Sequence, residues 1–257
     1  MTAAPGFLRW RSWGGADRRA LLLHGSTSSS ATWWRVGPAL AEAGWRVKAP
    51  DLPAHGASPR AGEALTPDVA ADWLRSELAD RPVDLVVGHN FGAAVALALL
   101  DGGPEIKTLV LEELPGRQSV DWGAKADAVV AGVRAARRDA QSTFTEIHAA
   151  QPDWTEEDCR QAVADLASAS AEEIAAGLRA VDRWPSLDAA RLSSPTLVLA
   201  APDAPGINRG ENATTLRGID RAAARVIADA FVEIDGGHCL HRDRPDAWLQ
   251  AVTGFTG

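Results

Sequence analysis

The sequence predicts an α/β fold, with a mostly parallel central sheet, helices on both faces of the sheet and a helical insertion between two of its strands. Short apolar runs alternate with longer amphipathic stretches along most of the chain, which is the pattern of parallel strands joined by crossover helices. The alternation breaks over residues 115–186, where we expect several helices in succession. A chain of 257 residues can bury a full core, and we expect residues 1–257 to form a single domain.

The elements of the first third of the chain are marked by residues that favour their ends. Gly44 suits the C-cap of a helix, and Thr66 with Pro67 provides an N-cap and a first-turn proline for another. Apolar and basic side chains alternate over residues 7–13, as in a half-buried edge strand. In order, we expect a strand at 7–13, a strand at 19–23, a helix at 32–43, a strand at 45–49 and a helix at 67–80.

The sharpest connection in the sequence joins an apolar strand at 85–87 to a helix at 93–100. Gly88 and Gly92 flank the turn, because a strand that runs straight into a helix leaves no room there for a Cβ atom. Asn90, between them, is forced into a strained backbone conformation that projects its side chain above the sheet. The pattern is that of the nucleophile elbow, G-x-S-x-G, with asparagine in place of serine.

Beyond this turn, prolines mark most of the expected breaks. Pro152 and Pro185 interrupt the helical insertion, and Pro195 leads into a late strand. In order, we expect a strand at 107–111, helices at 121–139, 141–150, 155–168 and 171–183, a strand at 196–200, a helix between about 211 and 228, a strand at 231–234 and a helix at 245–252.

Further motifs follow in a fixed order along the chain. They are His24-Gly25 after a strand, the loop Asp51-Leu-Pro-Ala-His-Gly-Ala-Ser58, Asp203 after a late strand, and Gly237-His238 near the end. With the elbow, they make the chain resemble the α/β-hydrolase superfamily over nearly its whole length, in its serine-hydrolase-like esterase, lactonase and thioesterase forms. The resemblance implies the α/β-hydrolase fold and makes the 115–186 insertion a cap that roofs the elbow and shapes the substrate pocket.

The resemblance also implies a catalytic triad in the chain order nucleophile, acid, base. Asn90 takes the nucleophile position, Asp203 is the expected acid and His238 the expected base. An imidazole that titrates near neutrality can take a proton from a nucleophile and return it to a leaving group, while the acid orients the ring. Glu112 and Glu113, after the preceding strand, are the competing acids, because some family members place the acid there.

The oxyanion hole, by the same resemblance, belongs to two backbone N–H groups, those of Ser26 and Phe91. The loop from Asp51 to Ser58 is interpreted as turn chemistry near the pocket, and His241 as a surface or packing residue.

Aromatic residues are the candidates for substrate binding. The chain has ten tryptophans and no tyrosine. Core packing is the commoner role of a tryptophan, given the area that it buries. The tryptophans at 33, 34, 122, 154 and 184 are candidates for an aromatic pocket, and we expect Trp33, Trp34 and Trp122 to bind substrate.

Asn90 is the departure from the family pattern. A carboxamide has no hydroxyl proton for His238 to remove, and loss of a triad nucleophile lowers turnover roughly 10⁶-fold. Three interpretations are open. Asn90 replaces a serine of an enzyme that hydrolyses an ester, lactone, thioester or amide; it replaces an aspartate of an epoxide hydrolase or dehalogenase; or it is the native residue of a non-covalent lyase or cyclase, or of a ligand-binding pseudo-hydrolase.

The sequence favours the first of these. Epoxide hydrolases of this fold use cap tyrosines, which this chain lacks. Haloalkane dehalogenases have tryptophan directly after the nucleophile, where this chain has Phe91. Both groups tend to carry H-G-x-P, whereas Ser26 and Thr27 follow the His-Gly pair here. We therefore expect an α/β-hydrolase that acts on a small, moderately apolar molecule and is nearly inactive as a covalent hydrolase with Asn90.

Composition limits the partners. A formal net charge of −8 without a long charged run argues against nucleic acid. No apolar run approaches the roughly 20 residues that span a bilayer, and no signal peptide is recognisable. Cys159 and Cys239 form neither a disulfide framework nor a zinc pattern. We expect a cytoplasmic monomer or homodimer that binds a small-molecule substrate, with no metal, organic cofactor, nucleic acid or membrane partner.

Overall fold

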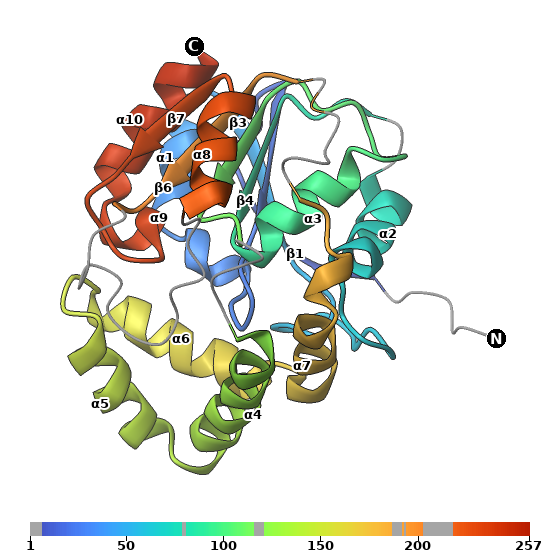
Figure 1. The fold of residues 1–257 in the computed structure, drawn as a ribbon. Helices are drawn as coiled ribbons and strands as arrows, with labels where there is room; N and C mark the ends of the chain where they lie inside the picture. The colour runs from blue at the N-terminus through green and yellow to red at the C-terminus, as the bar shows by residue number, and fades with distance from the viewer. Residues whose placement is uncertain (1–6, 79–80, 116–120, 187–191, 193, 203–217) are drawn as a thin grey trace.

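A computed structural model of the chain describes residues 7–78, 81–115, 121–186, 192, 194–202 and 218–257 (Figure 1). Within this part of the chain, seven strands form one sheet in the order β1-β3-β2-β4-β5-β6-β7. β1 pairs antiparallel with β3, and the other neighbouring pairs are parallel. The strands are β1 (Arg9–Trp13), β2 (Arg18–Leu23), β3 (Trp45–Asp51), β4 (Leu85–His89), β5 (Leu109–Glu112), β6 (Thr196–Ala200) and β7 (Ala230–Glu233). The predicted α/β-hydrolase fold, with its mostly parallel sheet, is confirmed.

Helices cover both faces of this sheet, and the alternation within a strand shows how. In β2, Leu21 and Leu23 pack in one hydrophobic cluster, which includes residues of α2 and α3. Ala20 and Leu22 point to the other face and pack in a second cluster with α1 and α10, since successive strand side chains face opposite ways. The helices beside the sheet are α1 (Val36–Glu42), α2 (Pro67–Leu78), α3 (Phe91–Leu99), α8 (Gly218–Ile227) and α10 (Pro245–Thr256).

Four further helices lie between β5 and β6 in the chain and gather at one end of the sheet (Figure 1). Each begins and ends within a few residues of its predicted bounds. They are α4 (Trp122–Arg138), α5 (Ala140–Ala150), α6 (Glu156–Ser168) and α7 (Ala171–Arg179). The start of α6 has a full capping box, in which the Thr155 hydroxyl accepts from the Asp158 amide while the Asp158 carboxylate accepts from the Thr155 amide.

Some elements differ from the sequence prediction. The single helix expected at 32–43 is a 3₁₀ turn, η1 (Ser30–Trp33), followed by α1. The Ser29 hydroxyl accepts from the Ala31 amide and so begins the 3₁₀ turn early. The end of the helix expected at 171–183 is likewise a 3₁₀ turn, η2 (Val181–Arg183). A short helix, α9 (Leu240–Asp243), was not predicted. The first part of the helix predicted at 211–228 lies outside the described residues.

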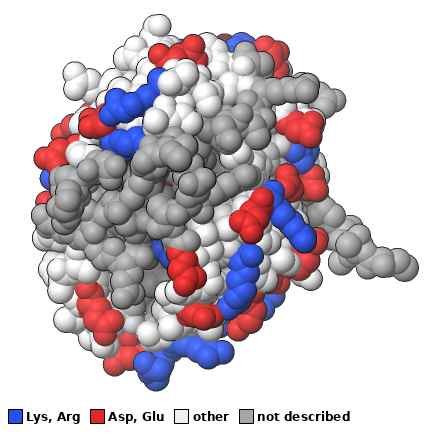
Figure 2. All heavy atoms as spheres, viewed as in Figure 1, with Lys and Arg blue, Asp and Glu red and all other residues white. Residues whose placement is uncertain are grey.

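Acidic and basic side chains are interspersed over the described residues on the face that Figure 2 shows. Among the helices that the structure describes, none combines the length and the apolar composition that a membrane span needs.

Candidate active site

The turn between β4 and α3 has the geometry of a nucleophile elbow. Asn90 has φ 49° and ψ −112° and caps the N-terminus of α3, so its backbone lies in the left-handed region that non-glycine residues rarely adopt. A Cβ atom at Gly88 would overlap the backbone of Gly92, and one at Gly92 would overlap the carbonyl of Leu23. The strain at Asn90 is therefore held in place by close packing on both sides.

His238 lies after β7, and its ring faces a carboxylate at the end of β5. The Nδ1 atom lies 3.3 Å from Oε2 of Glu113, whose side chain is fully buried. The other oxygen of Glu113 accepts from the Ala201 amide at 2.7 Å, so the carboxylate has a fixed position. If Nδ1–H donates to Glu113, Nε2 is left to accept a proton; this tautomer is assigned from the hydrogen-bond pattern.

The candidate acids occupy three different situations. Glu113 contacts His238, whereas Glu112 points to the opposite side and pairs with His241 at 2.8 Å. Asp203, the acid that the sequence favours, lies outside the described residues, and its role stays a prediction.

The loop after β2 supplies the first of the two predicted oxyanion donors. Ser26 lines the same cavity as Asn90 and His238. A Cβ atom at Gly25 would lie 2.7 Å from Nδ1 of His89 and 3.2 Å from the Cβ atom of Asn90, so only glycine lets this loop approach the elbow so closely. In the described part of the chain, the amides of Ser26 and Phe91 donate no hydrogen bond. Both are thus available to an oxyanion.

Two buried histidines hold this loop. Nε2 of His55 accepts from the Thr27 amide at 3.1 Å, and Nδ1 lies 3.0 Å from the carbonyl of Pro53. Nε2 of His24 accepts from the Leu52 amide at 2.9 Å. Burial lowers the pKa of His24 and lowers that of His55 to about 3. Both imidazoles are therefore neutral near pH 7 and act as structural acceptors.

The loop from Asp51 to Ser58 is built as the turn that the sequence predicts. The two carboxylate oxygens of Asp51 accept from the amides of Ser30 at 2.9 Å and Ala57 at 2.8 Å. The Ser58 hydroxyl donates to the Asp51 carbonyl at 2.6 Å. These contacts tie the loop to η1 beside the elbow.

His241 is buried in the core and packs there, so the alternative of a surface position is excluded. Its Nε2 lies 2.6 Å from the Thr32 hydroxyl, and Trp248 donates its indole N–H to Glu112 at 2.9 Å. Burial lowers the pKa of His241 and raises that of Glu112. The pair is a structural support beneath the site.

A cavity of about 690 Å³ connects the elbow to the α4–α7 helices. Its floor includes Asn90 and His238, and all four helices contribute to its walls. The apolar wall residues are Trp122 and Val129 from α4, Ile147 from α5, Leu166 from α6 and Leu178 from α7. A cavity of this size suits a small organic molecule.

The three predicted substrate-binding tryptophans have different positions. Trp122 lines the cavity, with its ring 5.8 Å from that of Trp184. Trp33 is fully buried in the core against Trp248 and His241. Trp34 donates its indole N–H to the buried Asp158 at 3.0 Å. Neither Trp33 nor Trp34 is among the residues that line the cavity. Trp33 packs in the core instead, and Trp34 belongs to the hydrogen-bond network around Asp158.

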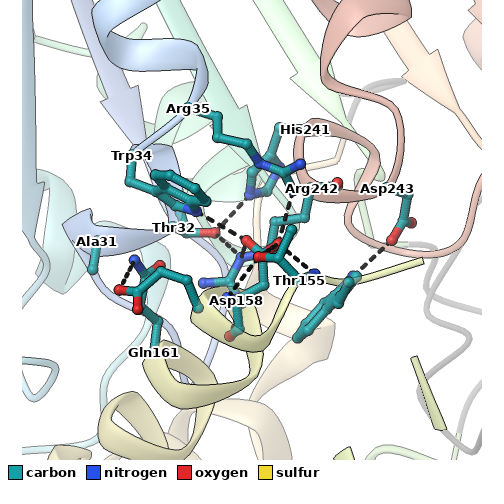
Figure 3. A network of polar contacts seen from close by, with 12 residues as sticks. Ala31, Thr32, Trp34, Arg35, Thr155, Asp158, Gln161, His241, Arg242 and Asp243 are labelled. Carbon is teal, nitrogen blue, oxygen red and sulfur yellow. Dashed lines mark hydrogen bonds and ion pairs between the residues drawn. The ribbon is translucent and has the colours of Figure 1, made fainter. Parts of the chain in front are cut away.

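That network fastens α6 to the body of the protein (Figure 3). Asp158 accepts from Arg35 at 2.8 Å and from the Thr155 hydroxyl at 2.7 Å. Arg242 donates to the Asp158 carbonyl at 3.1 Å and to the Thr32 hydroxyl at 2.9 Å. The roof of the cavity is thus tied to α9, which begins two residues after His238.

Comparison with known proteins agrees with this fold. Residues 20–251 match the sequence model of the Alpha/beta hydrolase family. The chain belongs to the alpha/beta hydrolase family. Over 98 residues it is 40% identical to the lipase LipV of Mycobacterium tuberculosis, a match that covers 36% of this chain and 36% of LipV.

Solved structures show the same fold. The chain is similar to the deformylase Nfo from Pseudomonas putida S16, with a TM-score of 0.71, 23% identity and 96% of each chain covered. It is also similar to a thermophilic esterase from Thermogutta terrifontis, with a TM-score of 0.73, 22% identity, and 96% of this chain and 92% of the esterase covered. At these identities the likeness concerns the fold.

Sequence reasoning missed some residues of this candidate site. Asp243 and Arg242 line the cavity, but both sit on α9, which carries no distinct sequence signal. Trp154 was identified only as one aromatic candidate among five. In the described part of the chain, no cluster of three or more His, Cys, Asp or Glu side chains has metal-binding geometry.

Proposed function

We propose that the cavity at the elbow is an acyl-hydrolase site for the ester, lactone, thioester or amide carbonyl of a small, moderately apolar molecule. We further propose that Asn90 stands where the serine nucleophile of the active form belongs. The observation that carries the proposal is the backbone of Asn90, which has φ 49° at the tip of the β4–α3 turn, in the wall of a cavity that His238 also lines.

The active form needs only a serine at position 90. Its hydroxyl loses a proton to Nε2 of His238 as the oxygen attacks the substrate carbonyl carbon. The oxyanion accepts hydrogen bonds from the amides of Ser26 and Phe91, assisted by the positive end of α3. His238 then protonates the leaving group, and water releases the acyl group by the same steps. Glu113 or Asp203 orients the imidazole throughout.

With Asn90 the reaction stops before the first covalent bond to the substrate forms. The carboxamide is neither a deprotonatable hydroxyl nor a carboxylate. The remaining parts, which are the oxyanion donors and the cavity, still bind a carbonyl substrate. We therefore expect the chain as it stands to bind acyl substrates and to turn them over very slowly.

The α4–α7 helices are the proposed cap of this single domain. Their apolar residues in the cavity wall, Val129, Ile147 and Leu166, suit the non-reacting part of a moderately apolar substrate. Trp122 adds a flat aromatic surface next to the elbow.

A second candidate function has one observation in its favour. The pairing of His238 with Glu113 at 3.3 Å is intact beside Asn90. A base held in this way has a use without a covalent nucleophile, because it can activate a water or remove a substrate proton while the Asn90 amide orients a carbonyl. This is a non-covalent lyase, cyclase or water-mediated hydrolase.

The test compares the unchanged chain with Asn90→Ser and Asn90→Asp. Each protein is assayed against p-nitrophenyl esters of increasing acyl length, a lactone, an epoxide and a haloalkane. We expect ester or lactone turnover by Asn90→Ser alone, lost again when His238→Ala is added. Turnover of the epoxide or haloalkane by Asn90→Asp would instead indicate an aspartate parent. Turnover by the unchanged chain with an inert Asn90→Ser would favour the second candidate.

A further inference from the structure

Asp243 lies between the base-bearing loop and the roof of the cavity, and it contacts both. Oδ2 accepts from the Gly237 amide at 2.7 Å, one residue before His238. Oδ1 accepts from the indole N–H of Trp154 at 2.7 Å, the hydrogen bond drawn from Asp243 in Figure 3. Asp243 is only 7% exposed, so both hydrogen bonds are largely shielded from water.

Trp154 reaches Asp243 from the segment between α5 and α6. This segment meets three consecutive residues of the base side, because the guanidinium of Arg242 lies 4.7 Å from the Trp154 ring and Arg244 pairs with Asp153 at 3.4 Å. Trp154, Asp153, Arg242 and Arg244 all line the cavity. A substrate in the cavity therefore touches the same segment that holds Asp243.

The loop that Asp243 fixes is the one that carries His238. The His238 carbonyl lies 2.9 Å from Nε2 of His89, and its ring lies against Glu113. His238 is therefore restrained at three points. Asp243 holds the amide of the preceding residue, Gly237, while His89 contacts the His238 carbonyl and Glu113 contacts its ring. These three restraints come from Asp243, His89 and Glu113, which belong to different parts of the chain.

We propose that Asp243 and Trp154 are positioning residues for His238, through which the α5–α6 segment of the roof sets the orientation of the base. The proposal rests on the proposed function for its catalytic consequence. The physical reason is that both partners of Asp243 are hydrogen-bond donors. A carboxylate satisfies two donors at once, whereas a carboxamide has one acceptor oxygen and turns its NH₂ group toward the second donor.

This donor count makes a double-variant cycle diagnostic. Asp243→Asn leaves either Gly237 or Trp154 facing an NH₂ group and releases the loop. Trp154→Phe removes the indole donor but keeps a ring beneath Arg242. In the double variant, the amide oxygen of Asn at 243 is free to face the Gly237 amide, so Trp154→Phe restores part of what Asp243→Asn loses.

The chain offers a matched control far from the site. Glu77 on α2 accepts from the Leu8 amide at 2.6 Å and from the indole N–H of Trp10 at 2.7 Å, the same pair of donor types. Glu77→Gln and Trp10→Phe therefore repeat the chemical changes without touching the cavity.

The first readout needs no activity. In the chain with Asn90, NMR follows the His238 imidazole signal, assigned by its loss in His238→Gln, and the exchange rate of the Gly237 amide. We expect the imidazole signal to move in Asp243→Asn and Trp154→Phe, to return toward its original position in the double variant, and to stay in place in the controls. The Gly237 amide should exchange at least about tenfold faster in Asp243→Asn, as for loss of roughly 1.4 kcal/mol of protection.

The second readout uses the Asn90→Ser form. We expect Asp243→Asn to lower kcat about 10- to 100-fold with KM nearly unchanged, because a displaced base affects the chemical step. An inert Asn90→Ser would count against the proposed function only, since the NMR cycle still tests the positioning role. An imidazole signal that stays in place in both single variants, or moves equally in the controls, would overturn that role.

Discussion

Nδ1 of His238 lies 3.3 Å from Oε2 of Glu113, a buried carboxylate whose other oxygen accepts from the Ala201 amide. Glu113 itself has φ 49°, so a second strained residue directly follows β5, as Asn90 follows β4. Both strained residues stand at the carboxyl ends of neighbouring parallel strands, the edge of the sheet at which ligands bind in open α/β folds. The imidazole of His238 thus lies against a carboxylate that is itself held by a backbone amide.

Replacing Glu113 tests whether it is the working acid. In the Asn90→Ser form, we expect Glu113→Gln to lower kcat by about 10²- to 10⁴-fold, because an amide holds the wrong tautomer of the base. Steady-state kinetics with a p-nitrophenyl ester measures the effect. Asp203→Asn is the comparison. A loss confined to Asp203→Asn would mean that Asp203 is the acid and that Glu113 only packs against the ring.

The approach of the loop that carries Ser26 to the elbow depends on Gly25. A methyl group there meets the His89 ring, whose Nε2 is held by the His238 carbonyl, so the loop with Ser26 must shift. We expect Gly25→Ala to lower kcat of the Asn90→Ser form about 10²-fold or more, as for loss of an oxyanion donor. Gly15→Ala is the control, since nothing lies within 4 Å of its added Cβ. Equal kinetics for the two alanine variants would rule out this role for Gly25.

Acid should destabilise the fold through its buried histidines. Burial lowers the pKa of His55 from 6.5 to about 3, so between these values the unfolded chain binds a proton that the folded chain does not. The free energy of unfolding therefore falls as the pH drops below 6.5, by up to about 1.4 kcal/mol per pH unit from one such histidine. Burial raises the pKa of Asp165 to about 6. Between about pH 6 and 3.8 the folded chain therefore binds a proton on Asp165 that the unfolded chain does not, and this carboxyl raises the free energy of unfolding as the pH falls.

Urea unfolding between pH 7.5 and 4.5 separates these contributions when the parent is compared with His55→Gln. The variant lacks the His55 proton linkage, so its unfolding free energy should fall less steeply with acid. Parallel curves for the two proteins would show that His55 does not titrate as described.

The attachment of α6 to the body depends on Asp158. It is fully buried and receives hydrogen bonds from Trp34, Arg35 and Thr155. We expect Asp158→Ala to lower the free energy of unfolding by about 3–5 kcal/mol, because Arg35 and the buried Arg242 lose the carboxylate with which they pair. Chemical denaturation measures the change. Glu156→Ala, which removes only an exposed ion pair with Arg160, should change stability by less than about 1 kcal/mol; similar losses for both would contradict this account.

Much of the fold followed from local signals. The elbow was predictable because Gly88, Asn90 and Gly92 stand between an apolar strand and a strong helix former. The turn between two such elements is so tight that a Cβ atom at either glycine would overlap the backbone. The α4–α7 helices were predictable because prolines and capping residues mark their ends. The split into η1 and α1 was not, since the Ser29 hydroxyl competes for the Ala31 amide in a way that periodicity does not reveal.

The site was predictable only where a motif fixed it. His238 followed from its position after the last strand, whereas the choice between Glu112 and Glu113 depends on which way each side chain points, and adjacent residues at a strand end point oppositely. The tryptophans show the same limit. Trp33 and Trp34 have aromatic rings suited to a pocket. Trp33 packs instead against the buried His241, and Trp34 donates its indole N–H to the buried Asp158.

The most direct test of the central claim is covalent labelling of residue 90. Asn90→Ser is treated with a fluorophosphonate, and intact-mass spectrometry with peptide mapping locates the adduct. The account predicts one phosphonyl group per chain, on the serine at position 90, formed quickly and abolished by His238→Ala. A properly folded Asn90→Ser protein that takes up no label, or carries it with undiminished speed after His238→Ala, would contradict it.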